Sequence, residues 1–184
     1  MLEKLPENLP APEDNGECDH LEGFKIPEIH LMCTNGSLID LAFKNTTVLY
    51  CYPMTGRPDV KLPSGWEEIP GARGCTPQSC AFRDINAELK ELGSDLYGLS
   101  VQDTDYQLEA KNRLGLNFEL ISDKEFAFSK ALKLPFLEVE ELVLIKRLTL
   151  IIENGIIKKC FYPVFPPDKN PRSVLNWLKS NVRG

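Results

Sequence analysis

The sequence of 184 residues lacks several features that define large classes of protein. It has no apolar run approaching the roughly 18 to 20 residues of a membrane-spanning helix, and its first residues show neither the basic start nor the apolar stretch of a signal peptide. Basic residues are in the minority, and the formal net charge of -6 has the wrong sign for binding phosphate backbones. We therefore expect a cytoplasmic protein with neither a membrane nor a nucleic-acid partner.

The cysteines include no CxxC pair of the kind that holds structural zinc. Six cysteines are also few for a disulfide scaffold, and a domain of this length buries an adequate core without crosslinks. We expect no metal and no cofactor, so any chemistry depends on thiol reactivity. The six are Cys18, Cys33, Cys51, Cys75, Cys80 and Cys160.

The order of sequence patterns predicts an α/β fold. Residues 1–23 are rich in proline and acidic side chains, which predicts an N-terminal extension that either lies over the fold or moves freely. In the single domain expected over residues 24–184, strand and helix patterns alternate, which favours parallel pairing, while Asn-Gly turns at 35–36 and 154–155 indicate antiparallel hairpins. The prediction is a mixed central sheet with helices on both faces, an extended arm and a β-hairpin.

The individual elements follow from periodicity and capping signals. We predict strands over 47–52, 96–101, 118–121, 143–153 and 156–162. Helices are expected to begin near Cys75, at the capping boxes that start at Thr104 and Ser122, and at Asn170 as N-cap. A loop over 53–74 carries many glycines and prolines, and a loop of that length inside a compact domain is usually functional.

Cys75 stands where this loop passes into the predicted helix. Open backbone N–H groups and the positive end of the helix dipole favour a thiolate there. Cys80 projects about 140° away from Cys75 around the helix, so we expect it to face outward. In an intact helix the two Cα atoms lie roughly 8 to 9 Å apart, beyond the ~7 Å limit for a disulfide, so a bond between them requires the helix start to unwind. Two cysteines at this spacing are also common as inert packing residues.

The segments Val48–Pro53 and Gly74–Asp84 resemble the peroxiredoxins of the AhpC/TSA family, most like the bacterioferritin-comigratory or Q type. In that type a strand ending in Tyr-Pro leads to a Gly-Cys-Thr-x-Glu/Gln-x-Cys helix start, and the match spans about residues 26–162. The resemblance implies a thioredoxin-like fold and thiol-dependent reduction of hydrogen peroxide or organic hydroperoxides. It also implies that Cys75 is the peroxidatic cysteine, Cys80 the resolving one and Arg147 the arginine that contacts thiolate and peroxide.

The chain departs from the family pattern beside Cys75. Most members carry Thr or Ser three residues before the peroxidatic cysteine, where this chain has Ala72, and the segment 54–73 looks like an insertion. The hydroxyl that helps to hold peroxide is therefore missing. We expect the substrate site to include Gly74, with either Thr55, if the loop folds back, or Arg73, through its charge, as the replacement.

The leading hypothesis is a peroxidase that forms a Cys75–Cys80 disulfide within one chain and is recycled by thioredoxin or a similar dithiol. Two alternatives are a thiol-disulfide oxidoreductase and a non-enzymatic peroxide sensor. The five-residue spacing argues against the oxidoreductase, because such enzymes usually use CxxC. The sequence is compatible with a monomer or a homodimer.

Overall fold

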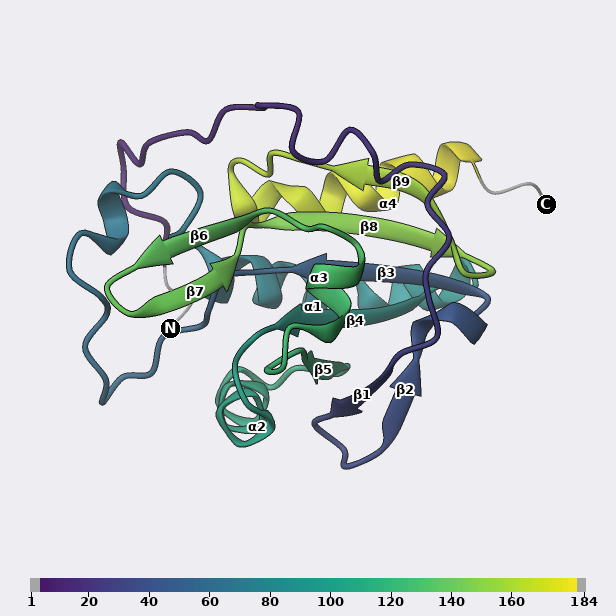
Figure 1. Cartoon of the computed structure of the whole chain (residues 1–184), viewed down its shortest axis with the longest axis horizontal. Helices are drawn as coiled ribbons and strands as arrows, with labels where there is room; N and C mark the ends of the chain where they lie inside the picture. Colours follow the sequence, from purple (N-terminus) through teal and green to yellow (C-terminus); the bar gives the residue numbers. More distant parts are fainter. Residues whose placement is uncertain (1–3, 182–184) are drawn as a thin grey trace.

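The computed structural model describes residues 4–181. A seven-stranded sheet forms its centre, and a separate two-stranded hairpin projects beside it (Figure 1). The strands are β1 (His30–Cys33), β2 (Leu38–Asp40), β3 (Thr46–Cys51), β4 (Asp95–Ser100), β5 (Glu119–Ser122), β6 (Phe136–Val139), β7 (Leu142–Ile145), β8 (Leu148–Glu153) and β9 (Ile156–Phe161). The helices are α1 (Cys75–Glu91), α2 (Thr104–Leu114), α3 (Ala127–Ala131) and α4 (Asn170–Asn181), with short 3-10 turns η1 (Leu41–Phe43), η2 (Trp66–Glu68) and η3 (Pro167–Lys169).

The central sheet has the order β2-β1-β5-β4-β3-β8-β9 and mixes both kinds of pairing. Strands β3, β4 and β5 pair in parallel, whereas β1 with β2, β1 with β5, β3 with β8 and β8 with β9 are antiparallel. The β3 stretch Val48–Cys51 is fully buried, as expected for a β-branched and aromatic run at the centre of a sheet covered on both faces. The predicted mixed α/β sheet is confirmed.

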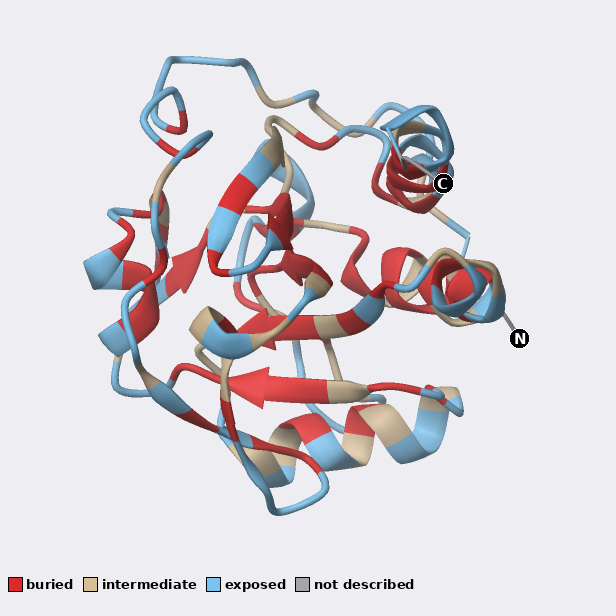
Figure 2. Ribbon diagram, turned by 90° about the vertical axis from the view of Figure 1, so that its right-hand side faces the viewer, coloured by how far each residue is buried: buried red, intermediate tan, exposed pale blue. Residues whose placement is uncertain are grey.

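Helices cover both faces of the sheet, as predicted. On one face α1 and α4 bury Phe82, Leu89 and Val174 against β3 and its neighbours. On the other face α3 contributes Phe128, which shares a core with Leu21 of the N-terminal arm. Figure 2 shows buried residues gathered on the strands and on the inner sides of the helices. None of the helices within residues 4–181 combines the length and the apolar character needed to cross a membrane.

The described part of the N-terminal arm lies over the fold. Gly23 donates its backbone N–H to the carbonyl of Ile157 in β9 (2.8 Å), and Ile157 donates back to Phe24 (3.0 Å). Further upstream, Pro12 lies beside Gly71, where it would contact a side chain at that position, and Leu5 lies beside Gly74. The arm therefore runs from the edge of the sheet to the start of α1.

Two predicted helix starts are wrong. Helix α2 is capped by Asp103, whose carboxylate accepts from the backbone of the first turn, and not by Thr104, which is already helical. Helix α3 begins five residues after Ser122, because the carboxylate of Asp123 binds two backbone N–H groups inside α3 at 2.9 and 2.8 Å. In both places an aspartate next to the predicted Ser or Thr provides the acceptor.

The predicted long strand over 143–153 is two strands, β7 and β8, which belong to different sheets. The chain leaves β7 at Lys146, whose N–H donates to Pro135 (2.9 Å), and enters β8 at Leu148. The strand β6, which the sequence analysis did not predict, pairs with β7. This interruption lets the side chain of Arg147 turn toward the start of α1 rather than follow the sheet alternation.

Candidate active site

Cys75 is the first residue of α1, and Gly74 makes that start possible. Gly74 is left-handed, with φ 116°, and a Cβ on it would lie 2.7 Å from Pro167 Cγ and 2.9 Å from Leu5 Cδ2. Only glycine fits both the backbone angle and the space. Because Gly74 has no side chain to cap the helix and the first turn carries no acidic residue, the N–H groups of Cys75 and Thr76 remain available to an anion.

Arg147 contacts the Cys75 thiol directly. Its Nη2 lies 3.1 Å from Cys75 Sγ and also donates to the carbonyl of Ala72 at 3.0 Å, while Nε donates to Gly71 at 3.3 Å. Arg147 and Cys75 are each only 3% exposed. The structure thus brings together the predicted residues Cys75, Arg147 and Gly74, and Ala72 takes part through its backbone.

A buried chain of amide side chains holds Arg147 in this position. Gln78 accepts from Arg147 Nη1 at 2.6 Å and donates to Asn170 Oδ1 at 3.1 Å, and Thr149 donates to the same Asn170 oxygen at 2.7 Å. Asn170 was predicted as an N-cap, but it has helical angles and its side chain serves this network instead. The sequence analysis assigned no role to these residues, although Gln78 occupies the Glu/Gln position of the family motif.

The positive charge of Arg147 has only neutral protein acceptors. Among residues 4–181 Arg147 forms no ion pair, and its hydrogen bonds go to two backbone carbonyls, one side-chain amide oxygen and the Cys75 thiol. A buried cation is costly unless it is paired with an anion. Among the groups that Arg147 contacts, the Cys75 sulfur is the one that takes up negative charge in thiol chemistry, and the guanidinium lies 3.1 Å from it.

A cavity of about 640 Å³ opens beside Cys75 and is formed largely by the 54–73 loop. Its apolar part includes Met54, Leu62, Trp66 and Leu114, and its charged part includes Lys4, Arg57, Arg73 and Arg113. Trp66 also belongs to a small core that the loop shares with the β6–β7 hairpin. The insertion is therefore a packed structure that shapes the approach to the thiol.

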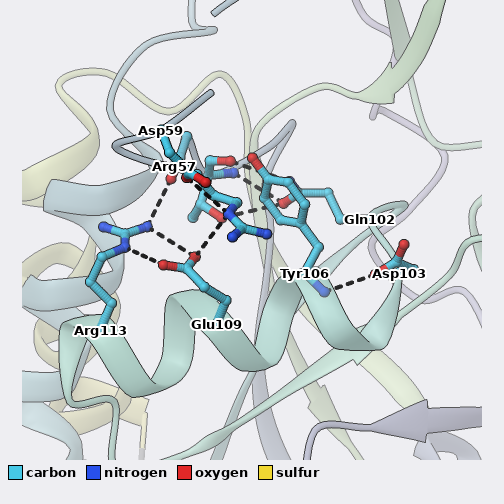
Figure 3. A network of polar contacts seen from close by, with 9 residues as sticks. Arg57, Asp59, Gln102, Asp103, Tyr106, Glu109 and Arg113 are labelled. Atoms are coloured by element: carbon cyan, nitrogen blue, oxygen red, sulfur yellow. Dashed lines mark hydrogen bonds and ion pairs between the residues drawn. The ribbon is translucent and has the colours of Figure 1, made fainter. Parts of the chain in front are cut away.

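Contacts with α2 hold the first part of this loop, as Figure 3 shows. Arg113 donates to the carbonyl of Gly56 at 2.8 Å and pairs with Glu109 at 2.7 Å. Arg57 lies over the ring of Tyr106, 5.5 Å from its centroid, and within 4.0 Å of Glu109. One face of α2 thus holds the start of the 54–73 loop, which lines the cavity.

The structure does not support Thr55 as the source of the missing hydroxyl. Thr55 is 1% exposed, its Oγ1 is 3.4 Å from Gln102 Oε1, and it is not among the residues that line the cavity beside Cys75. The side chain of Gln102 also binds the backbone of Thr55, accepting from its N–H at 3.0 Å and donating to its carbonyl at 3.2 Å. Arg73, the other candidate, does line the cavity, and its guanidinium pairs with Glu67 at 3.7 Å.

The expectation that Cys80 faces outward is wrong, because Cys80 is only 3% exposed. Cys80 lies opposite the apolar stripe of α1, but the end of α2 is close to it. Arg113 of α2 is near enough to affect the pKa of Cys80, and Arg83 of α1 donates a hydrogen bond to the carbonyl of Leu114. The prediction from helical periodicity was wrong because it treated the side of α1 opposite the apolar stripe as exposed to solvent. Burial raises the pKa of the Cys80 thiol, so Cys80 is protonated in the folded state at neutral pH.

The fold and the site together define a thioredoxin-like protein with a buried thiol centre at a helix start. A sequence model of the family described as Redoxin matches residues 21–177. That match covers most of the chain, and the chain therefore belongs to the redoxin family.

Individual relatives agree with this assignment. The chain is 29% identical over 164 residues to peroxiredoxin Q, chloroplastic, of Oryza sativa subsp. japonica, covering 86% of this chain and 67% of that protein. It is 27% identical over 164 residues to the protein of the same name from Arabidopsis thaliana, with 86% and 67% covered. The resemblance to the peroxiredoxins of the Q type is confirmed by these comparisons.

Solved structures confirm the thioredoxin-like fold. The chain superposes on peroxidoxin BcpB of Mycobacterium tuberculosis with a TM-score of 0.73 and 20% identity, covering 90% of this chain and 100% of the other. For PrxQ of Xylella fastidiosa the TM-score is 0.73 at 20% identity, with 89% and 99% covered.

Proposed function

We propose that this protein is a thiol-dependent peroxidase that reduces hydrogen peroxide or organic hydroperoxides at Cys75. The observation that carries the proposal is the 3.1 Å contact between Arg147 Nη2 and Cys75 Sγ at the open start of α1. Family membership and the peroxiredoxin Q relatives support the same activity.

In the first step the Cys75 thiolate attacks one peroxide oxygen and the O–O bond breaks. Cys75 becomes a sulfenic acid, and the other oxygen leaves as hydroxide or alkoxide and takes up a proton. Negative charge therefore moves from sulfur to oxygen during the reaction. Arg147, whose planar guanidinium serves several acceptors at once, and the open N–H groups of α1 stabilise that charge in the transition state.

In the second step the Cys80 thiol attacks the sulfenic sulfur of Cys75, which releases water and forms an intramolecular disulfide. Both residues lie in α1, so the first turns of that helix must unwind before the two sulfurs can bond. Unwinding also removes Cys80 from the buried environment that raises its pKa, which favours the thiolate needed for attack.

A dithiol such as thioredoxin completes the proposed cycle by exchange with the Cys75–Cys80 disulfide. The exchange returns both cysteines to thiols and leaves the disulfide in the reductant. We also carry forward, as predictions, a cytoplasmic location and a monomeric or homodimeric state.

The cavity beside Cys75 supports organic hydroperoxides as substrates in addition to hydrogen peroxide. Its volume of about 640 Å³ is far larger than hydrogen peroxide requires, and Met54, Leu62 and Trp66 offer apolar surface to an alkyl group. Gly74 and Arg73 lie on the same wall as Cys75 and are placed to contact the peroxide end.

Peroxide consumption in the presence of thioredoxin, thioredoxin reductase and NADPH tests the proposal. We expect the wild type to reduce many equivalents of peroxide and Cys75→Ser to reduce none above background. Cys33→Ser, which replaces a buried thiol far along the chain from α1, is the matched control and should retain activity. Consumption of one equivalent only by the wild type would instead indicate a sensor, and activity on protein disulfides without peroxide would indicate an oxidoreductase.

A further inference from the structure

A second pair of cysteines lies where the N-terminal arm crosses the end of β9. Cys18 belongs to the arm and is 7% exposed, and Cys160 is the fifth residue of β9 and is partly exposed. Both pack into the same apolar core on the face of the sheet opposite α1. The two thiols are near enough for Cys160 to raise the pKa of Cys18.

Contacts on both sides of Cys18 hold the arm in this register. Glu22 accepts from the backbone N–H of Cys160 at 3.2 Å and pairs with Lys159 at 3.4 Å. Glu17 accepts from the Tyr162 hydroxyl at 3.1 Å and pairs with Lys146 at 2.9 Å. Because the arm is anchored on both sides of Cys18, at Glu17 and Glu22, Cys18 is held beside the end of β9 that contains Cys160.

The arm around Cys18 can adjust to the geometry of a disulfide. Its backbone there forms turns, with Asp19 N–H donating to Gly16 (3.2 Å) and Leu21 N–H donating to Cys18 (3.1 Å), and is not part of a strand ladder. Cys160 is the more accessible of the two thiols, because it is partly exposed whereas Cys18 is buried. A small oxidant would therefore reach Cys160 before Cys18.

We propose that Cys18 and Cys160 form a second redox-active pair, which becomes a disulfide by exchange with a low-molecular-weight disulfide such as oxidised glutathione and ties the N-terminal arm to β9. The Cys160 thiolate attacks the oxidant, whose S–S bond breaks, giving a mixed disulfide and one free thiol. Cys18 then attacks the Cys160 sulfur, a second thiol leaves, and the proton of Cys18 goes to that thiolate. Two cysteine thiols are oxidised and one small disulfide is reduced to two thiols.

This pair differs chemically from Cys75 and does not depend on the peroxidase activity. The contact with Cys160 and burial both raise the pKa of Cys18, and the nearby Cys51 and Glu17 raise it further. No cation is among these influences, so direct attack of Cys18 on a peroxide is disfavoured. Exchange at the more exposed Cys160 is the favoured route.

Disulfide mapping by mass spectrometry tests the proposal in a Cys75→Ser background, which prevents Cys75 from supplying an oxidised sulfur. The folded protein is treated with oxidised glutathione, free thiols are blocked with N-ethylmaleimide, and the sample is digested with trypsin. Cys18, Cys160 and Cys51 fall in separate peptides, 5–25, 160–169 and 45–61, whereas residues 75 and 80 share peptide 74–83. We expect peptides 5–25 and 160–169 to be linked, with the loss of two hydrogen atoms.

Two further variants make the result decisive. With Cys18→Ser, the mixed disulfide of Cys160 with glutathione should accumulate, because the attacking thiol is absent. With Cys33→Ser, the control, the linked peptides should form as in the parent. Recovery of Cys18 and Cys160 as separate blocked or glutathionylated peptides, or a link between Cys160 and Cys51, would overturn the proposal.

The same bond should stabilise the protein, because it closes a loop from residue 18 to residue 160 in the unfolded chain. We expect Tm to rise by roughly 10 °C after oxidation and to return on reduction. Cys18→Ser should show no such rise. An equal rise in that variant would also contradict the proposed pair.

Discussion

The two pairs of cysteines show that burial alone does not decide which thiol reacts. Cys75 is 3% exposed and Cys18 is 7% exposed, so solvent reaches neither freely. Cys75, however, touches the guanidinium of Arg147 and lies at an open helix start. Cys18 is surrounded by another thiol and a carboxylate, and each of these neighbours opposes its ionisation.

Cys75 and Cys18 differ in whether their neighbouring side chains stabilise or oppose a negative charge on the sulfur. A thiolate next to Arg147 pairs with a buried cation that otherwise has only neutral partners. A thiolate at Cys18 would face the carboxylate of Glu17 and the thiols of Cys51 and Cys160, each of which raises the pKa of Cys18. Cys75 is therefore suited to attack a peroxide, whereas Cys18 is suited to slow exchange through its neighbour Cys160.

The largest expected effect comes from removing Arg147, the cation beside Cys75. Arg147→Ala should slow the reaction of Cys75 with peroxide by about 100- to 1,000-fold, because the charge on sulfur and on the leaving oxygen loses its stabilising donor. Stopped-flow measurement of the peroxide step gives the rate. Reduction of the Cys75–Cys80 disulfide by thioredoxin, measured separately, should change much less.

Arg147→Lys separates charge from geometry and guards against simple unfolding of the alanine variant. Lysine keeps the positive charge but cannot serve Cys75, Ala72 and Gln78 together as arginine does. Its rate should fall between those of the wild type and Arg147→Ala. An Arg147→Ala protein that is folded by circular dichroism and reacts at the wild-type rate would refute the role given to this contact.

The next effect concerns Cys80, the proposed resolving cysteine. Cys80→Ser should reduce one equivalent of peroxide at the normal rate and then stop, because the Cys75 sulfenic acid has no thiol to attack it. Dimedone labelling of peptide 74–83 should then trap the sulfenic acid. Cys160→Ser is the matched variant from the second pair and should sustain turnover. Continued turnover by Cys80→Ser would show that another thiol resolves Cys75.

The sequence was sufficient for features that depend on local chemistry. Alternating patterns and Asn-Gly turns predicted the mixed sheet, and the glycine-rich approach predicted the helix start at Cys75. Arg147 was identified through the family resemblance, and its contact with Cys75 is present. The predictions of the sheet and of the helix start succeed because propensities, turns and capping act over a few residues.

Features that depend on contacts between distant segments of the chain could not be predicted from local sequence patterns. The burial of Cys80 follows from chain segments outside α1, and no helical periodicity contains that information. The link from Gln78 to Asn170 joins residues 92 positions apart. Thr55 does not line the cavity beside Cys75, and it is bound through its backbone and hydroxyl by Gln102, which follows β4. Long-range packing decided each of these outcomes.

A smaller effect follows from two buried thiols, Cys51 and Cys80, whose pKa values burial raises. Burial raises the pKa of Cys51 and of Cys80, so both hold their protons in the folded protein at pH values where the unfolded thiols ionise. The unfolded state then binds fewer protons than the folded state. The stability that these thiols contribute is therefore full below about pH 8.5 and is lost as the pH rises above that value.

Denaturant unfolding as a function of pH measures this loss. The free energy of unfolding should fall above about pH 8.5, by up to about 1.4 kcal/mol per pH unit for a fully buried thiol such as Cys51. Cys51→Ala should flatten the slope, whereas Ser129→Ala, which removes a buried group that does not titrate there, should shift the curve without changing its slope. A slope unaffected by Cys51→Ala would show that this thiol ionises equally in both states.

The smallest expected effect is that of Thr55→Val. This variant tests whether the Thr55 hydroxyl assists Arg147 in the reaction at Cys75. Valine keeps the shape of threonine, and both backbone bonds to Gln102 remain, so only the 3.4 Å hydroxyl contact is lost. We expect kcat/KM for hydrogen peroxide to stay within about twofold of wild type and stability to fall by about 1 kcal/mol. A tenfold loss of kcat/KM with unchanged stability would instead place the Thr55 hydroxyl on the peroxide in the reacting state. Charge from Arg147 and the helix start would then be insufficient, and the contrast between the two cysteine pairs would depend on a hydroxyl as well as on a cation.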